Sequence, residues 1–306
     1  MTQAGGHASH GRADLRAALT EAARLLAVAG VPSAEHDARA LAAHALGVER
    51  LEPALAPVPP ADFFPTFAAL VARRSAREPL QHIVGSTAFR YLTLAVRPGV
   101  FVPRPETETV AQQAVDEAAR LARHGRVPVV VDLCTGAGAI AIAVATEVPA
   151  AVVTAVDASE QAVALTRHNA EACGAQLRLE HGDATDPGVL AELDGTVDVV
   201  VSNPPYIPPD AVPADPEVRD HDPALALYGG GPDGLAVPRG VIERSAALLR
   251  DGGLLVMEHA DVQGADVRAA VAATGAFAQV ATLPDLTGRE RMVVARRVAR
   301  HAGDGT

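Results

Sequence analysis

The sequence contains no lysine and no tryptophan, and only 3 % of its 306 residues are aromatic. Without lysine, the chain cannot form the lysine-containing phosphate loop of P-loop NTPases. For the same reason it cannot form a Schiff base with pyridoxal phosphate. The small number of aromatic side chains argues against a wide stacking surface for single-stranded nucleic acid.

Cysteines and long apolar runs are also scarce. Cys134 and Cys173 are the two cysteines, too few for a disulfide framework, which is typical of a reducing cytoplasm. We find no signal-peptide core at the N-terminus and no uninterrupted apolar run of about 18 residues. We therefore expect a cytoplasmic protein without a membrane span. His7 and His10 could bind a metal in principle, but we expect a frayed terminus there and no metal site.

The charge is strongly acidic, with a formal net charge of −11. Nucleic-acid binding draws its affinity from clustered positive charge, so a stable nucleic-acid partner is disfavoured. A basic protein partner would be attracted instead. We expect the chain to be a monomer.

Residues 1–78 predict a small helical domain that serves packing or docking. Apolar residues recur at helical spacing from Asp14 to Ala29 and again from Ser33, which can cap the second helix, to Gly47. A third helix follows a proline-rich stretch and holds Phe63, Phe67, Leu70 and Val71. Residues 79–98 change period and predict a strand hairpin or linker that includes Ile83 and Val84.

Residues 99–306 alternate between strand and helix patterns, after a helix start at Pro105 and Glu106. This alternation predicts a mostly parallel sheet covered by helices on both faces, with an antiparallel pair at its end. The predicted strands cover residues 127–133, 151–157, 176–183, 196–203, 252–259, 277–283 and 289–298.

A glycine-rich turn directly follows the first of these strands: Cys134, Thr135, Gly136, Ala137 and Gly138. In open α/β sheets, ligands bind at the carboxyl ends of the strands, and glycine lets the backbone approach them closely. By itself this turn also satisfies the dinucleotide-binding fingerprint.

Two acidic residues bear on whether this turn binds a dinucleotide or S-adenosylmethionine. Asp157 ends the second strand and can accept both hydroxyls of a ribose, which either kind of ligand would require. Asp132, inside the first strand, would repel a pyrophosphate but attract a cationic amino-acid group. Asp132 therefore favours S-adenosylmethionine over a dinucleotide.

The third strand is followed by Asp183 and Ala184. Asp183 would either accept a hydrogen bond from the adenine amino group or cap its own turn, and Ala184 is too small to stack on adenine.

The fourth strand ends in Asn203, Pro204, Pro205 and Tyr206. An amide nitrogen is a poor nucleophile, so a site that methylates it must hold the NH₂ group by its hydrogens and aim the nitrogen. The Asn203 side-chain oxygen and the Pro204 carbonyl can each accept one hydrogen, and the prolines stiffen the backbone. Tyr206 offers a ring face for a flat group. The proline-rich, acidic stretch from Ile207 to Pro232 would form either a solvated loop or a functional lid that receives a basic partner.

With these motifs the sequence resembles the HemK/PrmC family of release factor glutamine methyltransferases over residues 12–297. Three segments carry most of the resemblance: Phe101-Val102-Pro103-Arg104-Pro105-Glu106-Thr107-Glu108, Asp132 to Gly138, and Asn203-Pro204-Pro205-Tyr206-Ile207. Further matches are Arg77 to Gly85, His221 to Leu227, Gly230 to Gly234 and Asp285 to Arg291.

This resemblance implies a class I S-adenosylmethionine-dependent methyltransferase, Rossmann-like with a mostly parallel seven-stranded sheet, joined by the hairpin linker to the helical bundle. It implies methylation at N5 of the glutamine in the Gly-Gly-Gln motif of peptide chain release factors, with S-adenosylhomocysteine as the second product. The bundle would help to dock that partner. Asp132, Cys134 to Gly138, Asp157, Asp183, Ala184, Asn203 and Phe101 are the expected cofactor contacts. Asn203 to Tyr206 would hold the substrate, with Asn203, Pro204 and Tyr206 as catalytic residues.

Other functions stay open at this point. The Asn-Pro-Pro-Tyr sequence is shared with enzymes that methylate exocyclic amino groups of nucleic-acid bases, and another protein glutamine could be the acceptor. A binding protein that had lost catalysis is disfavoured by the intact Asn203 and Tyr206. A nicotinamide oxidoreductase is disfavoured by Asp132 and by the lack of a hydride-relay constellation.

Overall fold

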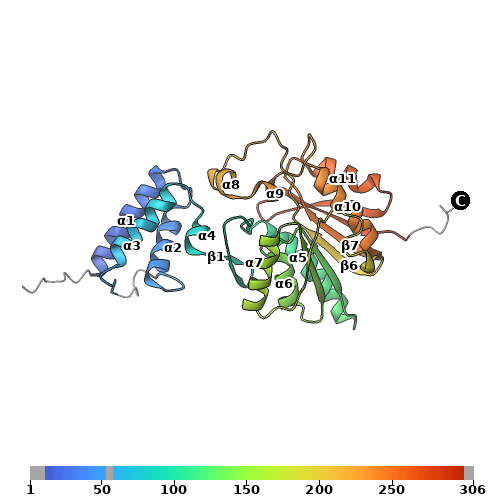
Figure 1. Cartoon of the computed structure of the whole chain (residues 1–306), viewed down its shortest axis with the longest axis horizontal. Coiled ribbons are helices and arrows are strands. Elements are labelled where there is room, and N and C mark those ends of the chain that lie inside the picture. Colours follow the sequence, from blue (N-terminus) through green and yellow to red (C-terminus); the bar gives the residue numbers. More distant parts are fainter. Residues whose placement is uncertain (1–10, 53–57, 300–306) are drawn as a thin grey trace, which may run out of the picture. The chain divides into compact units, whose positions relative to one another are not determined.

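The computed structural model describes residues 11–52 and 58–299, so His7 and His10 lie outside the described residues. The chain divides into two compact units, which we treat separately (Figure 1). Unit 1 comprises residues 1–86 and 214–221, and unit 2 comprises residues 87–213 and 222–306. Within the described ranges, no helix has the length and apolar character needed to cross a membrane.

Unit 1 is helical. Its elements are α1 (Arg12–Val28), α2 (Ala34–Leu46), α3 (Phe63–Ser75), α4 (Leu80–Val84) and α8 (Pro216–His221). Apolar side chains of α1 to α4 form one buried core, and the predicted core residues of the third helix, Phe63, Phe67, Leu70 and Val71, are all buried. The three predicted helices are confirmed.

Two local predictions for unit 1 are wrong. Ile83 and Val84 lie in the helix α4 rather than in a strand, because Pro79 starts a helical turn and Gly85 ends it in the left-handed conformation (φ +77°). The hairpin consists only of β1 (Ser86–Phe89) and β2 (Leu92–Ala95). Ser33 does not cap α2 with its side chain, since its hydroxyl donates to the Asp37 carboxylate instead (2.8 Å).

A buried arginine joins α8 to the other helices of unit 1. Arg74 donates to the Asp37 carboxylate (2.7 Å) and to Glu217 of α8 (2.5 Å), and all three residues are buried. Arg77 makes two further hydrogen bonds to Glu217. These arginines keep the pKa of Glu217 well below its usual range despite its burial.

The stretch 207–232 is not a plain loop, because it contains α8 and the short helix α9 (Ala224–Leu227).

Unit 2 contains a seven-stranded sheet with the spatial order β5-β4-β3-β6-β7-β9-β8. The first five strands in this order pair in parallel, whereas β9 is antiparallel to both β7 and β8. This arrangement confirms the predicted sheet and its antiparallel end. The strands are β3 (Val129–Leu133), β4 (Val152–Asp157), β5 (Arg178–His181), β6 (Val197–Ser202), β7 (Leu249–Glu258), β8 (Phe277–Pro284) and β9 (Glu290–Arg297).

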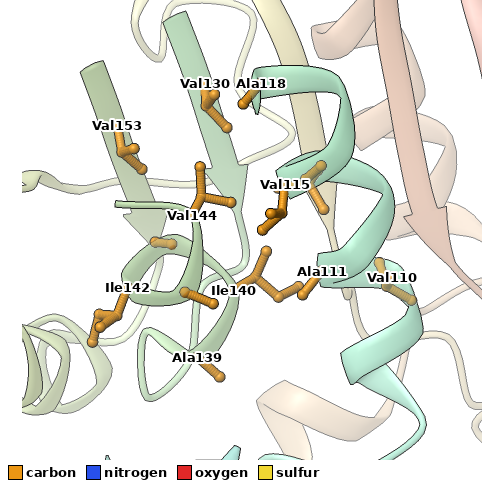
Figure 2. Close-up of a cluster of buried hydrophobic side chains, with 14 of the residues drawn as sticks. Val110, Ala111, Val115, Ala118, Val130, Ala139, Ile140, Ile142, Val144 and Val153 are labelled. Carbon is orange, nitrogen blue, oxygen red and sulfur yellow. The ribbon is translucent and has the colours of Figure 1, made fainter. Parts of the chain in front are cut away.

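Helices cover both faces of this sheet. Figure 1 shows α5 (Thr107–Arg123), α6 (Ala139–Glu147) and α7 (Glu160–Ala172) on one side and α10 (Ala236–Leu248) and α11 (Gly264–Ala273) on the other. Successive strand residues belong to opposite cores: Val130 packs with α5 and α6, and Val131 packs with α10 and α11. Burial on both faces explains why the central strands are almost continuously apolar. Figure 2 shows Val115, Ile140 and Val144 gathered beside Val130 in the first of these cores.

Candidate active site

The predicted site residues follow three strands that are neighbours in the sheet. β3 lies between β4 and β6, and its last residue, Leu133, pairs with Ser202 of β6. The Ser202 hydroxyl also donates to the Leu133 carbonyl oxygen (2.7 Å), which ties the two strand ends together. The chain passes from β3 to β4 on one side, whereas β6 lies on the other. Strand order therefore reverses at this edge, which is where ligands bind in open α/β sheets.

The turn after β3 has a backbone that few side chains would tolerate. Cys134, Gly136 and Gly138 all have positive φ angles, of 62°, 60° and 85°. A Cβ atom at Gly138 would lie 2.7 Å from Thr166 Cγ2, so this glycine allows α6 and α7 to pack closely. A Cβ atom at Gly136 would meet nothing within 4 Å, so the backbone there faces open space. Gly136 is therefore the position at which we expect a ligand to approach the turn.

Asp132 supports this turn from inside the sheet. Its Oδ2 accepts hydrogen bonds from the Thr135 hydroxyl (2.6 Å) and from the backbone N–H of Ala141 in α6 (3.1 Å). Its Oδ1 is buried and has no hydrogen-bond partner among the described residues. Burial raises the pKa of Asp132 to about 7. Burial and the Asp157 and Asp132 carboxylates also raise the pKa of the Cys134 thiol, so this cysteine is not a thiolate nucleophile.

Asp157, at the end of β4, contacts the same turn. Its Oδ2 accepts from the Gly136 N–H (2.8 Å) and its Oδ1 accepts from the Ser159 N–H (2.9 Å), while burial raises its pKa. Each carboxylate oxygen keeps a lone pair for a further donor such as a ribose hydroxyl.

The remaining predicted cofactor contacts lie in varied surroundings. Asp183 is exposed, and its Oδ1 accepts from the backbone and hydroxyl of Thr185 (2.8 Å each), as the turn-capping interpretation requires. Ala184 is buried in the core of unit 2. The Arg104 guanidinium lies 5.1 Å from the Phe101 ring centroid and donates to Asp222. Cofactor contacts at Asp183, Ala184 and Phe101 stay predictions.

The segment Asn203–Tyr206 begins where β6 ends. The Asn203 amide nitrogen donates to the Thr107 hydroxyl at the start of α5 (3.2 Å). Within the described part of the chain, neither the Asn203 side-chain oxygen nor the Pro204 carbonyl oxygen accepts a hydrogen bond. These are the two acceptors that the sequence predicts for an NH₂ group.

Two glycines and a glutamine hold the backbone of this segment. A Cβ atom at Gly229 would lie 2.6 Å from the Pro205 carbonyl oxygen, and one at Gly234 would lie 2.4 Å from that of Tyr206. The Gln263 amide nitrogen donates to the Tyr206 carbonyl (2.8 Å) and to the Asp233 carbonyl (3.1 Å). The 229–234 loop therefore packs directly against the Asn-Pro-Pro-Tyr backbone, at a distance that only glycine permits.

Sequence reasoning missed Thr107, Glu258 and Gln263 as parts of this site. Glu258, the last residue of β7, accepts hydrogen bonds from Thr107 (2.8 Å) and from the Tyr206 hydroxyl (3.3 Å). Burial and the nearby Glu258 carboxylate raise the pKa of Tyr206, so its hydroxyl stays protonated. The only sequence indication for Thr107 was its place in the Pro-Arg-Pro-Glu-Thr-Glu segment.

Comparisons with known proteins identify the family of this chain. The family model "PrmC N-terminal domain" matches residues 17–85, and the model "Methyltransferase small domain" matches residues 98–214. The chain is 50 % identical to the release factor glutamine methyltransferase of Streptomyces coelicolor, over 92 % of this chain and 98 % of that protein. The enzyme of the same name from Mycolicibacterium smegmatis is 49 % identical over 94 % of this chain and 99 % of that protein. The chain belongs to the release factor glutamine methyltransferase family.

One relative carries a different name. A 4-amino-L-phenylalanine/4-methylamino-L-phenylalanine methyltransferase of Streptomyces pristinaespiralis is 43 % identical over 88 % of this chain and 91 % of that protein. Among solved structures, a Thermus thermophilus 16S rRNA N2 G1207 methyltransferase in complex with AdoMet and guanosine resembles this chain with a TM-score of 0.50. It is 22 % identical and covers 69 % of this chain and 49 % of that chain, a likeness that supports the class I methyltransferase fold alone.

The residues present fit S-adenosylmethionine, the methyl donor of this family. The open backbone at Gly136 leaves room for a ligand beside the turn. Asp157 can accept ribose hydroxyls. Asp132 Oδ1 is buried behind the turn with no hydrogen-bond partner among the described residues, and a cationic ligand beside the turn would favour the ionised form of this carboxyl.

Proposed function

We propose that this chain methylates the side-chain amide nitrogen of the glutamine in the Gly-Gly-Gln motif of peptide chain release factors. The observation that carries the proposal is the pair of unused acceptors, the Asn203 side-chain oxygen and the Pro204 carbonyl oxygen, next to a turn that suits S-adenosylmethionine. Relatives that match almost the whole chain bear the corresponding name.

The cofactor residues divide into those that bind and those that shape the turn. Asp157 would bind the ribose hydroxyls, and the backbone from Cys134 to Gly138 would follow the ligand. Asp132 holds Thr135 and the start of α6 in place. When bound, S-adenosylmethionine supplies a methyl group that a positively charged sulfur makes electrophilic.

The protein's own part in the reaction is orientation. The amide nitrogen is a weak nucleophile because its lone pair is delocalised into the carbonyl group. Asn203 and Pro204 would each accept one of its two hydrogens and so direct the nitrogen toward the donor. The two prolines and the glycine-packed loop behind them limit movement of these acceptors. Tyr206 would supply a flat surface for the glutamine amide.

A second candidate acceptor is an aromatic amine, because one relative is named for methylation of 4-amino-L-phenylalanine. Both acceptors present a flat NH₂ group, and the same two oxygens would hold either one. Exocyclic amino groups of nucleic-acid bases share this chemistry, but the net charge of −11 disfavours a polyanionic substrate. We further propose that the enzyme is a cytoplasmic monomer whose release factor substrate presents a basic surface to it.

The test is mass spectrometry after incubation with S-adenosylmethionine. Purified release factors, 4-amino-L-phenylalanine and bulk RNA would be offered in parallel, with Asn203→Ala as the matched control enzyme. We expect one added methyl group on the Gly-Gly-Gln peptide and none on a release factor whose glutamine is replaced by asparagine. Methylation of the aromatic amine or of RNA, with release factors unchanged, would overturn the proposal.

A further inference from the structure

A chain of hydrogen bonds lies behind Asn203. The Asn203 amide nitrogen donates to the Thr107 hydroxyl oxygen (3.2 Å), and that hydroxyl donates to Glu258 Oε2 (2.8 Å). The other oxygen of Glu258 accepts from the Tyr206 hydroxyl (3.3 Å). Two side chains of the Asn-Pro-Pro-Tyr segment are thereby connected to one carboxylate.

The two residues that close this chain are well shielded from solvent. Thr107 is 4 % exposed and Glu258 is 3 % exposed. Among the charged side chains of the described residues, Arg291 of β9 lowers the pKa of Glu258 and Glu106 raises it. The Thr107 and Tyr206 hydroxyls lower the pKa by hydrogen bonding, but burial has the largest effect and raises it to about 7. Asp285 accepts two hydrogen bonds from Arg291 and so holds this cation in place.

The protonation of Glu258 sets the direction of every bond in the chain. An ionised carboxylate only accepts, so the single hydroxyl proton of Thr107 must point toward it. The Thr107 oxygen can then only accept a hydrogen bond from Asn203. The amide nitrogen of Asn203 can donate this bond, whereas its amide oxygen cannot. The Asn203 oxygen is consequently directed away from Thr107, and no described residue donates to it.

We propose that Thr107 and Glu258 are positioning residues that fix the amide orientation of Asn203, so that its oxygen and not its nitrogen faces the NH₂ group of the substrate. This inference rests on the proposed function, in which that NH₂ group belongs to glutamine. If the Asn203 amide were rotated by half a turn, its N–H groups would face the N–H groups of the substrate. Two donors cannot form a hydrogen bond, so the rotated form would not hold the substrate. Protonated Glu258 could donate to Thr107 and so permit the rotated form.

Three variants separate orientation from stability. Thr107→Val keeps the shape of the side chain but removes the hydroxyl, whereas Thr107→Ser keeps the hydroxyl and serves as the rescue control. Glu258→Gln still offers Thr107 an acceptor oxygen, and its amide cannot titrate. For each variant we would measure kcat and KM for a Gly-Gly-Gln peptide, the Kd for S-adenosylmethionine by calorimetry, and Tm.

For Thr107→Val we expect kcat to fall by about 10²-fold, the scale of losing one preorganised polar contact, with the Kd for S-adenosylmethionine nearly unchanged. Thr107→Ser should recover most of this loss. In the wild type, kcat should fall as the pH drops through about 7, because the protonated form of Glu258 no longer fixes the chain of bonds. Glu258→Gln should show no such acid limb, because its side chain cannot titrate.

An NMR titration of the Glu258 carboxyl carbon gives a readout independent of turnover. We expect a midpoint near 7 in the wild type and a higher one in Thr107→Val, which lacks a hydrogen bond that stabilises the carboxylate. The inference would be overturned if Thr107→Val had the same kcat as the wild type, or if Glu258→Gln still lost activity as the pH dropped through about 7. If the wild type methylates 4-amino-L-phenylalanine and no glutamine peptide, the proposed function fails, and the same variants then test the orientation of Asn203 with that amine.

Discussion

Replacement of Gly234 by alanine tests whether the loop behind the Asn-Pro-Pro-Tyr segment determines its position. Gly234 is buried and has a φ angle of +74°. A Cβ atom there would lie 2.4 Å from the Tyr206 carbonyl oxygen, 2.6 Å from Pro208 N and 2.7 Å from Ile207 C. All three contacts are with backbone, so no side-chain rotation can relieve them.

The size of the effect follows from these distances. Ordinary contacts of a Cβ atom begin at 3.4 Å, so the backbone near Tyr206 must move by about 1 Å. A misplacement of about 1 Å can reduce a rate by about 10²-fold, and we expect this loss in kcat for glutamine methylation. The binding of S-adenosylmethionine should change little, because the turn at residues 134–138 is not displaced.

Gly275→Ala is the matched control. Gly275 also has a positive φ angle, of +64°, but a Cβ atom there would meet nothing within 4 Å. Both variants carry the strain of an alanine in the left-handed region, about 1–2 kcal/mol, and only Gly234→Ala displaces the site. Activity would be measured by transfer of a radiolabelled methyl group, with the folded fraction checked by circular dichroism. Equal kcat values in two folded variants would refute this role for Gly234.

Four further variants address single interactions. Asn203→Ala should lower turnover by about 10²–10³-fold and leave the Kd for S-adenosylmethionine within a few-fold; unchanged turnover would remove Asn203 from the mechanism. Asp157→Ala should weaken cofactor binding first, measured by calorimetry, and an effect confined to peptide affinity would contradict its assignment to the ribose. Arg74→Met leaves the buried Asp37 carboxylate without its cation, so chemical denaturation should show a loss of about 3 kcal/mol in the free energy of unfolding. Arg24→Met removes an exposed ion pair and should leave the free energy of unfolding nearly unchanged. Equal losses in the two arginine variants would argue against a role for burial.

Much of the fold follows from local pattern. The near-continuous apolar runs in the central strands reflect burial on both faces of the sheet, and the glycine turn after Leu133 marks the end of a strand. The helix periodicity of residues 14–29 and 63–75 identifies faces that the structure buries. Local patterns of this kind were less reliable at Ile83 and Val84, where β-branched residues suggested a strand although Pro79 and Gly85 delimit one helical turn.

By itself, the sequence determined the order of strands and helices, the turn after β3 and the short segment from Asn203 to Tyr206, because these depend on residues adjacent in the chain. Only the tertiary structure decided that Thr107 and Glu258 meet behind Asn203, that Gly234 packs on Tyr206, and that Glu217 pairs with Arg74. Thr107 and Glu258 lie 151 positions apart, and a hydrogen bond between distant residues leaves no periodic pattern in a single sequence. Such pairs form because the sheet brings several strand ends to one edge. Polar groups buried at this edge need hydrogen-bond partners, and these come from neighbouring strands and helices that are distant in the sequence.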